Sequence, residues 1–242
     1  HHSFTNIEGW DEDIEKGIMR FSPTQKRKKA FRYQIFYAPL LYGLLTAYWF
    51  IAKDFVQLID YNKRGLMKAQ GLSFSSALLE ILFNKTWYIG LMFILPIMIT
   101  NFPWWLIVSG YFLMQFIAGI ILAFIFQSAH VLEETEFFIP DDKVSVENHW
   151  AIHQMKTTAN FANGSKLFSW FIGGLNYQIE HHLFPNICHV HYKNIAPIVK
   201  KTAKEFGIPY HHHKTFLGAL KSHFKLLNDL GTGKYDEKAA TA

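Results

Sequence analysis

The sequence predicts an all-α integral membrane protein, in which a transmembrane helical hairpin is joined to a helical cap with a histidine-rich site. Three observations predict this class. An uncharged segment runs from Thr86 to Ala129, basic clusters flank the apolar parts of the chain, and paired histidines occur both at its beginning and in its C-terminal half. Soluble proteins rarely contain so long an uncharged segment, so a buried helix pair in a soluble protein is the weaker alternative.

The uncharged segment predicts two membrane crossings, because one helical crossing needs roughly 20 apolar residues. An Asn-Phe-Pro tripeptide at 101–103 lies near its middle, where asparagine and proline favour a turn. We therefore predict an antiparallel hairpin over residues 86–127, with arms at Thr86–Thr100 and Trp104–Phe126.

A second uncharged segment, Tyr33–Ala52, is also about long enough to cross a bilayer. It follows residues 1–32, a polar cytosolic segment in which acidic residues precede the basic cluster Lys26–Lys29. Basic clusters next to apolar segments lie on the cytoplasmic side of membranes, and anionic lipid headgroups are their expected partner. No nucleic-acid-binding module is recognisable, so we expect no nucleic-acid partner.

From His130 onward the chain is soluble in character, and residues 128–231 are predicted to form a cytosolic helical cap. The expected helices are 146–160, 165–172, 194–206 and 215–230. Gly207 and Gly231 stand where C-terminal caps of the last two helices would lie. Residues 232–242 are expected to be a frayed tail. The single cysteine, Cys188, excludes an intramolecular disulfide framework.

The strongest histidine cluster is Gln178-Ile179-Glu180-His181-His182. On a helix, positions i, i+3 and i+4 share a face, so Gln178, His181 and His182 would project together and two imidazoles could reach two neighbouring metal ions. Imidazole suits iron, zinc, copper and nickel, so the ligand type alone does not choose the metal. Taken alone, the cluster is equally consistent with an ordinary histidine pair. For His1-His2, the remnant of an affinity tag is the alternative.

The sequence around these histidines is more specific. The opening segment HHSFTNIEGWDEDI resembles the second histidine box of membrane fatty-acid desaturases, HxxHH followed by a Thr-Asn pair and acidic residues. The segment GLNYQIEHHLFP resembles their third box, in the QxxHH form typical of front-end desaturases. Thr157–Phe161 and the PYH sequence near the C-terminus also fit. The resemblance extends over essentially the whole chain.

The resemblance implies a pair of irons held by histidines. His1 and His2 would be the last two ligands of the second box, and His181 and His182 the ligands of the third. His130 stands where the family has a histidine at the cytosolic end of its last transmembrane helix. For His130 a polar helix end at the membrane interface is the alternative.

Four further residues are expected around the irons. Gln178 replaces a histidine of another branch of the family, and would bind iron weakly, bind through water or only shape the site. Asn6, Asp11 and Asp13 are candidate hydrogen-bond partners of the ligands, because a metal-bound histidine usually donates its other N–H to a carboxylate or carbonyl. A solvated acidic turn is the alternative for the two aspartates.

The remaining histidines are weaker candidates. His149 and His153 are four residues apart, a spacing common among metal ligands. The triplet 211–213 is expected to be a solvated surface patch, and His223 to lie on an amphipathic helix without a functional role.

The proposed ligand set constrains the membrane topology. Five imidazoles at one centre must lie on one side of the bilayer, so the chain between His2 and His130 crosses an even number of times. The hairpin supplies two crossings, and Tyr33–Ala52 is therefore predicted not to cross but to be interfacial or re-entrant. Its tyrosines and Trp49 suit such a position.

The resemblance further implies that residues 1–242 are the C-terminal two-thirds of one desaturase domain. The family's first box, HxxxH, and the leading histidine of the second would lie upstream of His1. We expect residues 1–242 alone to be inactive, with half a metal site.

The implied reaction introduces a cis double bond into a fatty-acyl chain, with O2 and two electrons from an external donor, cytochrome b5 or ferredoxin. The substrate would be an acyl-CoA or an acyl-lipid, and the protein would reside among the lipids of a bacterial inner membrane or the endoplasmic reticulum, with its site on the cytosolic side. One alternative is a lipid hydroxylase on the same scaffold. Another is a zinc-dependent membrane hydrolase or receptor, which needs about three histidines and one metal.

Overall fold

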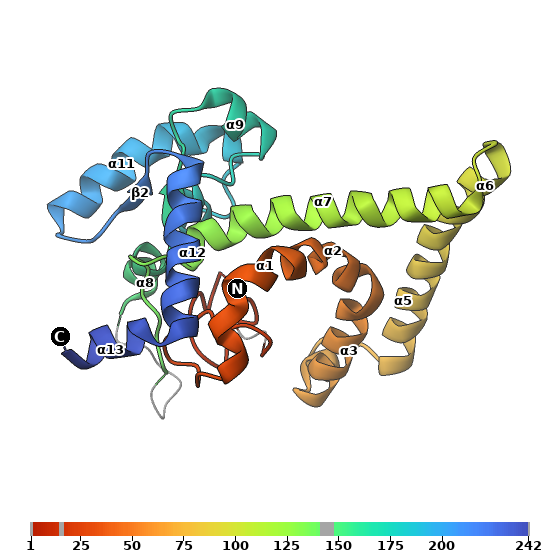
Figure 1. Ribbon diagram of the computed structural model, residues 1–242, viewed down its shortest axis with the longest axis horizontal. Helices are drawn as coiled ribbons and strands as arrows, with labels where there is room; N and C mark the ends of the chain where they lie inside the picture. Colours follow the sequence, from red (N-terminus) through yellow and green to blue (C-terminus); the bar gives the residue numbers. More distant parts are fainter. Residues whose placement is uncertain (1, 15–16, 141–147, 242) are drawn as a thin grey trace. The chain divides into compact units, whose positions relative to one another are not determined.

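The structure is a computed structural model that describes residues 2–14, 17–140 and 148–241 (Figure 1). It comprises two compact units, which are described separately below. Unit 2 is Pro39–Ala123, and unit 1 consists of the segments on either side of it, His1–Ala38 and Phe124–Ala242. Most of the described chain is helical, as predicted.

In the part of the chain that the structure describes, two continuous helices are long and apolar enough to cross a membrane. The first is continuous from Phe74 to Ile99 and consists of α5 (Phe74–Ile89), η3 (Gly90–Ile94) and α6 (Leu95–Ile99). The second, α7 (Trp104–His130), begins in unit 2 and ends in unit 1. The two arms of the predicted hairpin are thus present, joined by a short turn.

The first arm begins at Phe74, well before the predicted Thr86. Ser73 caps the helix by accepting a hydrogen bond from the backbone N–H of Ser76, which satisfies one of the donors at the helix start. Lys85, one of the charged residues on which the predicted boundary rested, lies inside the helix and pairs with Asp54 at 2.8 Å. A paired lysine does not interrupt a helix, so the charge pattern placed the boundary too late.

The segment before this arm is a bent helix pair, Lys29–Gly43 and Leu45–Lys63, with an angle of 55° at the break. By length and composition it is compatible with a broken span or with a re-entrant segment. The expectation that Tyr33–Ala52 does not cross therefore stays a prediction. The elements of this segment are η1 (Lys29–Tyr33), α1 (Gln34–Gly43), α2 (Leu45–Tyr48), η2 (Trp49–Lys53) and α3 (Asp54–Lys63), followed by α4 (Leu66–Ala69).

Small residues allow α1 and α7 to approach closely within unit 2. A Cβ atom at Gly119 would lie 2.6 Å from the carbonyl oxygen of Tyr42 and 2.7 Å from that of Gly43. Beside this contact, the hydroxyl of Thr46 donates to the backbone oxygen of Gln115 at 2.6 Å. Close backbone packing at small residues is typical of helices in membranes.

Unit 1 contains the sequence segments of both histidine pairs and also His130. Its elements after α7 are α8 (Trp150–Thr157), β1 (Ala159–Phe161), α9 (Lys166–Phe171), α10 (Gln178–Leu183), η4 (His189–His191), α11 (Tyr192–Glu205), β2 (His211–His213), α12 (Phe216–Thr232) and α13 (Lys234–Thr241). The two strands pair in parallel, with Ala159 opposite His211. Neither strand was predicted.

The C-terminal part of the chain differs from the prediction in two respects. Gly207, at φ 66°, follows α11 as expected, but α12 continues through Gly231 and ends before Gly233, at φ 90°. Gly231 instead lies against the backbone of Phe31, where a side chain would collide. The expected frayed tail forms α13, and Asp236 accepts two hydrogen bonds of 2.8 Å from the guanidinium of Arg20.

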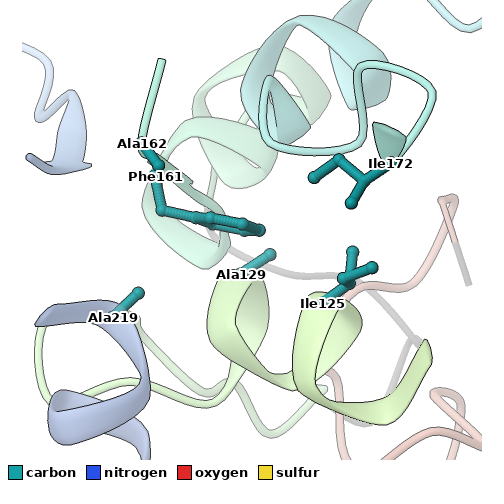
Figure 2. Close-up of a cluster of buried hydrophobic side chains, with 6 residues drawn as sticks. All are labelled: Ile125, Ala129, Phe161, Ala162, Ile172 and Ala219. Atoms are coloured by element: carbon teal, nitrogen blue, oxygen red, sulfur yellow. The ribbon is translucent and has the colours of Figure 1, made fainter. Parts of the chain in front are cut away.

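A hydrophobic cluster holds the end of α7 in unit 1 (Figure 2). Its buried members are Ile125, Ala129, Phe161, Ala162, Ile172 and Ala219. Phe168 and Phe216 pack against it with ring centroids 5.1 Å apart. The last turns of the candidate span are therefore fixed to β1, to the end of α9 and to the start of α12.

Candidate metal centre

The QIEHH sequence forms the short helix α10, as predicted. Gln178 and His182 are buried, and His181 is half-buried. The backbone N–H of Ile179, at the helix start, donates to the side-chain oxygen of Asn160 at 2.9 Å. Such a bond satisfies a donor that the helix itself cannot, and it fixes the position of α10 against β1.

Four histidines from three parts of the chain come together in unit 1. The rings of His2 and His182 are stacked with centroids 4.3 Å apart, and His2 meets His181 edge-on at 4.5 Å. The ring of His130, at the end of α7, lies 4.7 Å from that of His182. His1 lies outside the described residues. The structure thus brings together the four predicted ligands that it describes, although more than a hundred residues separate His2 from His130.

The rings of His2 and His130 both contact that of His182, and His2 also contacts His181. Within residues 2–14, 17–140 and 148–241, no group of three or more histidine, cysteine, aspartate or glutamate side chains has the arrangement of a metal site. The role of these histidines as metal ligands therefore stays a prediction.

Burial keeps the imidazoles neutral. It lowers the pKa of His181, and it lowers the pKa of His182 far below the ordinary value, with further lowering by His130 and His2 nearby. Burial and the neighbouring His181 also lower the pKa of His2. A neutral imidazole has a lone pair on one nitrogen, which is the form that binds metal ions.

Each of three rings has a hydrogen-bonding group at its Nδ1 atom. His182 Nδ1 lies 2.8 Å from the side-chain oxygen of Gln154, and His130 Nδ1 lies 3.2 Å from the backbone oxygen of Thr157. His181 Nδ1 lies 3.3 Å from the hydroxyl of Tyr192, which itself donates to the backbone oxygen of Phe184. The backbone oxygen of Thr157 and the side-chain oxygen of Gln154 can only accept, so in His130 and His182 the proton lies on Nδ1 and the lone pair on Nε2. The hydroxyl of Tyr192 can donate to or accept from His181 Nδ1.

Gln154 also connects the beginning of the chain to α10. The hydroxyl of Thr5 donates to the same Gln154 oxygen at 3.1 Å, and the Nε2–H of His153 donates to the backbone oxygen of Thr5 at 2.7 Å. The spacing of His149 and His153 suggested a metal ligand, but His153 is a buried donor that holds the loop after His2.

Gln178 has an unsatisfied polar group. Its side chain comes within hydrogen-bonding reach of His130, while its amide nitrogen is buried and has no hydrogen-bond partner among the described residues. A buried donor without an acceptor costs about 1–3 kcal/mol. This position therefore favours a further acceptor that the described protein groups do not supply.

Of the three predicted partners of the ligand rings, Asn6 and Asp11 hold the loop after His2 through their side chains, and Asp13 takes part through its backbone N–H. Their role as partners of the rings stays a prediction. Asn6 adopts a left-handed conformation, φ 56°, and its amide donates to the backbone oxygens of His130 at 2.8 Å and Glu136 at 3.1 Å. The carboxylate of Asp11 accepts hydrogen bonds from the backbone N–H groups of Asn6 at 2.8 Å and Asp13 at 3.0 Å. Asn6 thus fixes the backbone of His130, and Asp11 stabilises the turn that contains Asn6.

Glu180 fastens α10 to the two strands. Its buried carboxylate accepts hydrogen bonds from Asn160 at 2.7 Å and from the hydroxyl of Tyr210 at 3.0 Å. Burial raises the pKa of Glu180, although these hydrogen bonds oppose the shift. Burial and the nearby Glu180 also raise the pKa of Tyr210.

The triplet His211–His213, expected to be a solvated surface patch, forms strand β2, in which His212 is exposed and His211 and His213 are half-buried. His213 Nε2 hydrogen-bonds Glu134, and Ser222 donates to the other oxygen of the same carboxylate at 2.9 Å. His223, expected to have no role, is fully buried and its Nδ1 contacts the backbone oxygen of Val131 at 2.8 Å.

Sequence reasoning missed Gln154, Tyr192 and Thr157 as partners of the histidines. Thr157 lies in a segment that fitted the family pattern, but it acts through its backbone oxygen. No sequence signal distinguishes Gln154 or Tyr192 from other polar residues on helices.

The chain is similar to known proteins of one family. The model of the fatty acid desaturase family matches residues 1–214. The chain is 39% identical over 236 residues to an sn-1 linoleoyl-lipid 6-desaturase of Synechocystis sp., covering 96% of this chain and 64% of the relative. It is 37% identical over 239 residues to an acyl-lipid (8-3)-desaturase of Physcomitrium patens, covering 97% and 49%. To the Delta(5) fatty acid desaturase A of Dictyostelium discoideum it is 34% identical over 239 residues, covering 96% and 50%.

No solved structure matches the chain. The chain spans between 49% and 64% of the length of these three relatives. The family model nevertheless covers both histidine boxes and the hairpin between them. The chain belongs to the fatty acid desaturase family.

Proposed function

We propose that this chain contains most of the catalytic domain of a front-end fatty-acyl desaturase, which introduces a cis double bond into an acyl chain at a pair of histidine-bound irons. One observation carries the proposal. His2 and His182, from the two sequence boxes, stack in a buried cluster with His130 and His181. Nothing in local sequence brings these residues together, and a shared metal centre accounts for their convergence.

The residues of the cluster fit iron in their chemistry. Neutral imidazoles suit iron among other transition metals. The Nδ1 contacts orient three rings through Gln154, Thr157 and Tyr192, as supporting hydrogen bonds orient metal ligands elsewhere. The buried Gln178 donor adds a place for an acceptor that arrives with the metal.

His1, His2, His130, His181 and His182 would hold the irons, with Gln178 beside them. When bound, the irons supply the oxidising chemistry that an unactivated methylene requires and that side chains lack. The protein's own groups orient the rings, keep them neutral by burial and fix α10 through Glu180. The groups beside the three Nδ1 atoms are uncharged, so the protein would add no carboxylate charge to the metal pair through them.

The overall reaction balances with one O2. Two hydrogens leave adjacent carbons as the double bond forms, and with two electrons and two protons from outside they reduce O2 to two waters. The electrons would come from cytochrome b5 or ferredoxin. The names of the relatives include linoleoyl-lipid and acyl-lipid desaturases, which favours an acyl-lipid over an acyl-CoA as substrate.

The test is expression of the complete protein in a host that lacks the product. The expected result is a new cis double bond in the host's fatty acids and two irons per purified chain. A hydroxy acid in place of the alkene would indicate a hydroxylase on the same scaffold. A single zinc per chain without any new fatty acid would overturn the proposal in favour of a zinc-dependent membrane hydrolase or receptor.

The same ligand set implies a membrane topology. Since His2 and His130 both contact His182, the chain between them crosses the bilayer an even number of times. We infer that Phe74–Ile99 and α7 cross, and that Lys29–Lys63 enters and returns on the cytosolic side. A membrane-impermeant thiol reagent applied outside right-side-out membranes should then label Phe102→Cys, in the turn between the spans, and spare a cysteine at Lys63. Labelling at position 63 would contradict this topology.

A further inference from the structure

Helix α9 is apolar on two opposite sides. Phe168 and Ile172, on one side, pack in the cluster at the end of α7. Leu167, Trp170 and Phe171, at positions i, i+3 and i+4, form the other side and are 75%, 78% and 68% exposed. We call these three residues the outer ridge. An apolar helix face normally packs against protein or lies in a membrane, so the outer ridge favours a second apolar environment.

The position of the outer ridge relative to the membrane follows from its packing. The inner side of α9 shares one cluster with Ile125 and Ala129 of α7, which lie close together in Figure 2. Helix α7 is an uncharged candidate span that ends at His130. Ile125 and Ala129 are in its last two turns, so α9 lies at the level where the span leaves the bilayer.

The composition of the ridge matches that level. Tryptophan, here Trp170, is enriched where membrane and water meet because its ring is apolar with a polar N–H, and Leu167 and Phe171 beside it are wholly apolar. Lys166, which begins α9, is exposed and able to reach lipid phosphates. The chain has no acidic residue between Lys156 and Glu180, so no negative charge near the ridge in the sequence opposes contact with anionic headgroups.

We propose that the outer ridge of α9 lies in the headgroup region of the bilayer, and that its partner is the lipid itself. The ridge would anchor the cap at a second place besides α7. Because α10 follows α9 after a short turn, this anchor would fix the distance of the histidine cluster from the membrane surface. The inference rests on the membrane span and on the packing of α9, not on the catalytic activity.

Fluorescence quenching tests the proposal in the complete protein, reconstituted in vesicles of phosphatidylcholine and phosphatidylglycerol. Cys188, the only cysteine here and exposed, is replaced by serine together with any cysteine outside this sequence. A single cysteine is then introduced as Trp170→Cys and labelled with an environment-sensitive fluorophore. Lys204→Cys, on the exposed side of α11, serves as the matched control, and Leu167→Cys repeats the measurement if the first variant does not fold.

At position 170 or 167 we expect emission shifted to the blue and quenched severalfold more by a lipid with a nitroxide near its headgroup than at position 204. Iodide in the aqueous phase should quench the fluorophore at position 204 more than the one at position 170 or 167. Equal iodide quenching at both positions would overturn the proposal, since the ridge would then face water. Blue-shifted emission that neither quencher reaches would also overturn it, because another protein segment would then cover the ridge.

Discussion

Two histidine-rich sequences of this chain look alike but lie in different chemical environments. His181-His182 lies on α10, and its Nδ1 atoms contact the uncharged side chains of Tyr192 and Gln154. His211–His213 lies on β2, where His213 pairs with the carboxylate of Glu134. Burial lowers the pKa of His181, of His182 and also of His211. Low basicity therefore does not distinguish the two sequences.

The two histidine sequences differ in whether their rings contact histidines from other parts of the chain. His182 touches the rings of His2 and His130, which come from distant parts of the chain, whereas the described contacts of His213 are to a carboxylate. Convergence of neutral imidazoles suits a metal pair, while an imidazole–carboxylate pair suits cross-linking of structure. Four predictions test this comparison.

The largest effect is expected from His182→Ala, compared with His212→Ala as its matched control. If His182 is a ligand as proposed, its loss should lower the iron content of the complete protein below the two irons per chain expected there. Desaturation should fall by more than the roughly 10- to 100-fold that follows loss of a supporting hydrogen bond. His212→Ala should leave both unchanged. Iron analysis and fatty-acid profiling measure the result, and equal losses in the two variants would remove the distinction drawn here.

Gln154→Leu should have the next largest effect. It removes the acceptor for His182 and Thr5 while keeping similar volume. We expect metal affinity to weaken by about 10- to 100-fold, as for other supporting partners. Gln154→Glu keeps both acceptor contacts and should retain iron, but its charge should lower the midpoint potential of the metal pair. If Gln154→Leu binds iron normally, the proposed orienting role is wrong.

Tyr192→Phe should have a smaller effect on the same property. The contact of the Tyr192 hydroxyl with His181 Nδ1 is longer, at 3.3 Å, than that of Gln154 with His182 at 2.8 Å. We expect a loss of metal affinity of about 10-fold or less, at the low end for supporting partners. A competition titration with a chelator gives both affinities on one scale. A larger loss than for Gln154→Leu would reverse the order inferred from the distances.

The smallest effect is expected at the other histidine sequence, from Glu134→Gln. Burial raises the pKa of Glu134, but the hydrogen bond and charge of His213 outweigh it, so the pKa lies below its ordinary value of 4.5. A carboxyl whose pKa is lowered by folding stabilises the protein above its ordinary pKa and loses this effect as the pH falls through the lowered value. The pair is partly exposed, so about 0.2–1 kcal/mol is expected.

Thermal unfolding of wild type and Glu134→Gln across a pH series measures this difference. At neutral pH wild type should be slightly more stable, and the two proteins should converge as the pH falls below the ordinary carboxyl range. Iron content should not differ between them. A loss of iron in Glu134→Gln would assign the second histidine sequence to the metal centre.

Much of the fold follows from local sequence. The uncharged segment predicts both arms of the hairpin, because a helix satisfies its own backbone hydrogen bonds within a bilayer. The glycine after α11 and the helical QIEHH sequence were likewise confirmed. The prediction was wrong where distant contacts override local signals. Helix α12 continues beyond Gly231, which packs against the backbone of Phe31. The tail is helical, and its Asp236 pairs with Arg20.

By itself, the sequence determined the helical class, the apolar hairpin and the identity of the paired histidines, since hydrophobic pattern and residue type act over short distances. Only the tertiary structure decided which histidines meet and which groups hold them. Gln154, Tyr192 and the backbone of Thr157 reach their partners from other elements, and the strand pair β1–β2 joins segments about fifty residues apart. Such contacts depend on how the elements pack, and no local pattern records them.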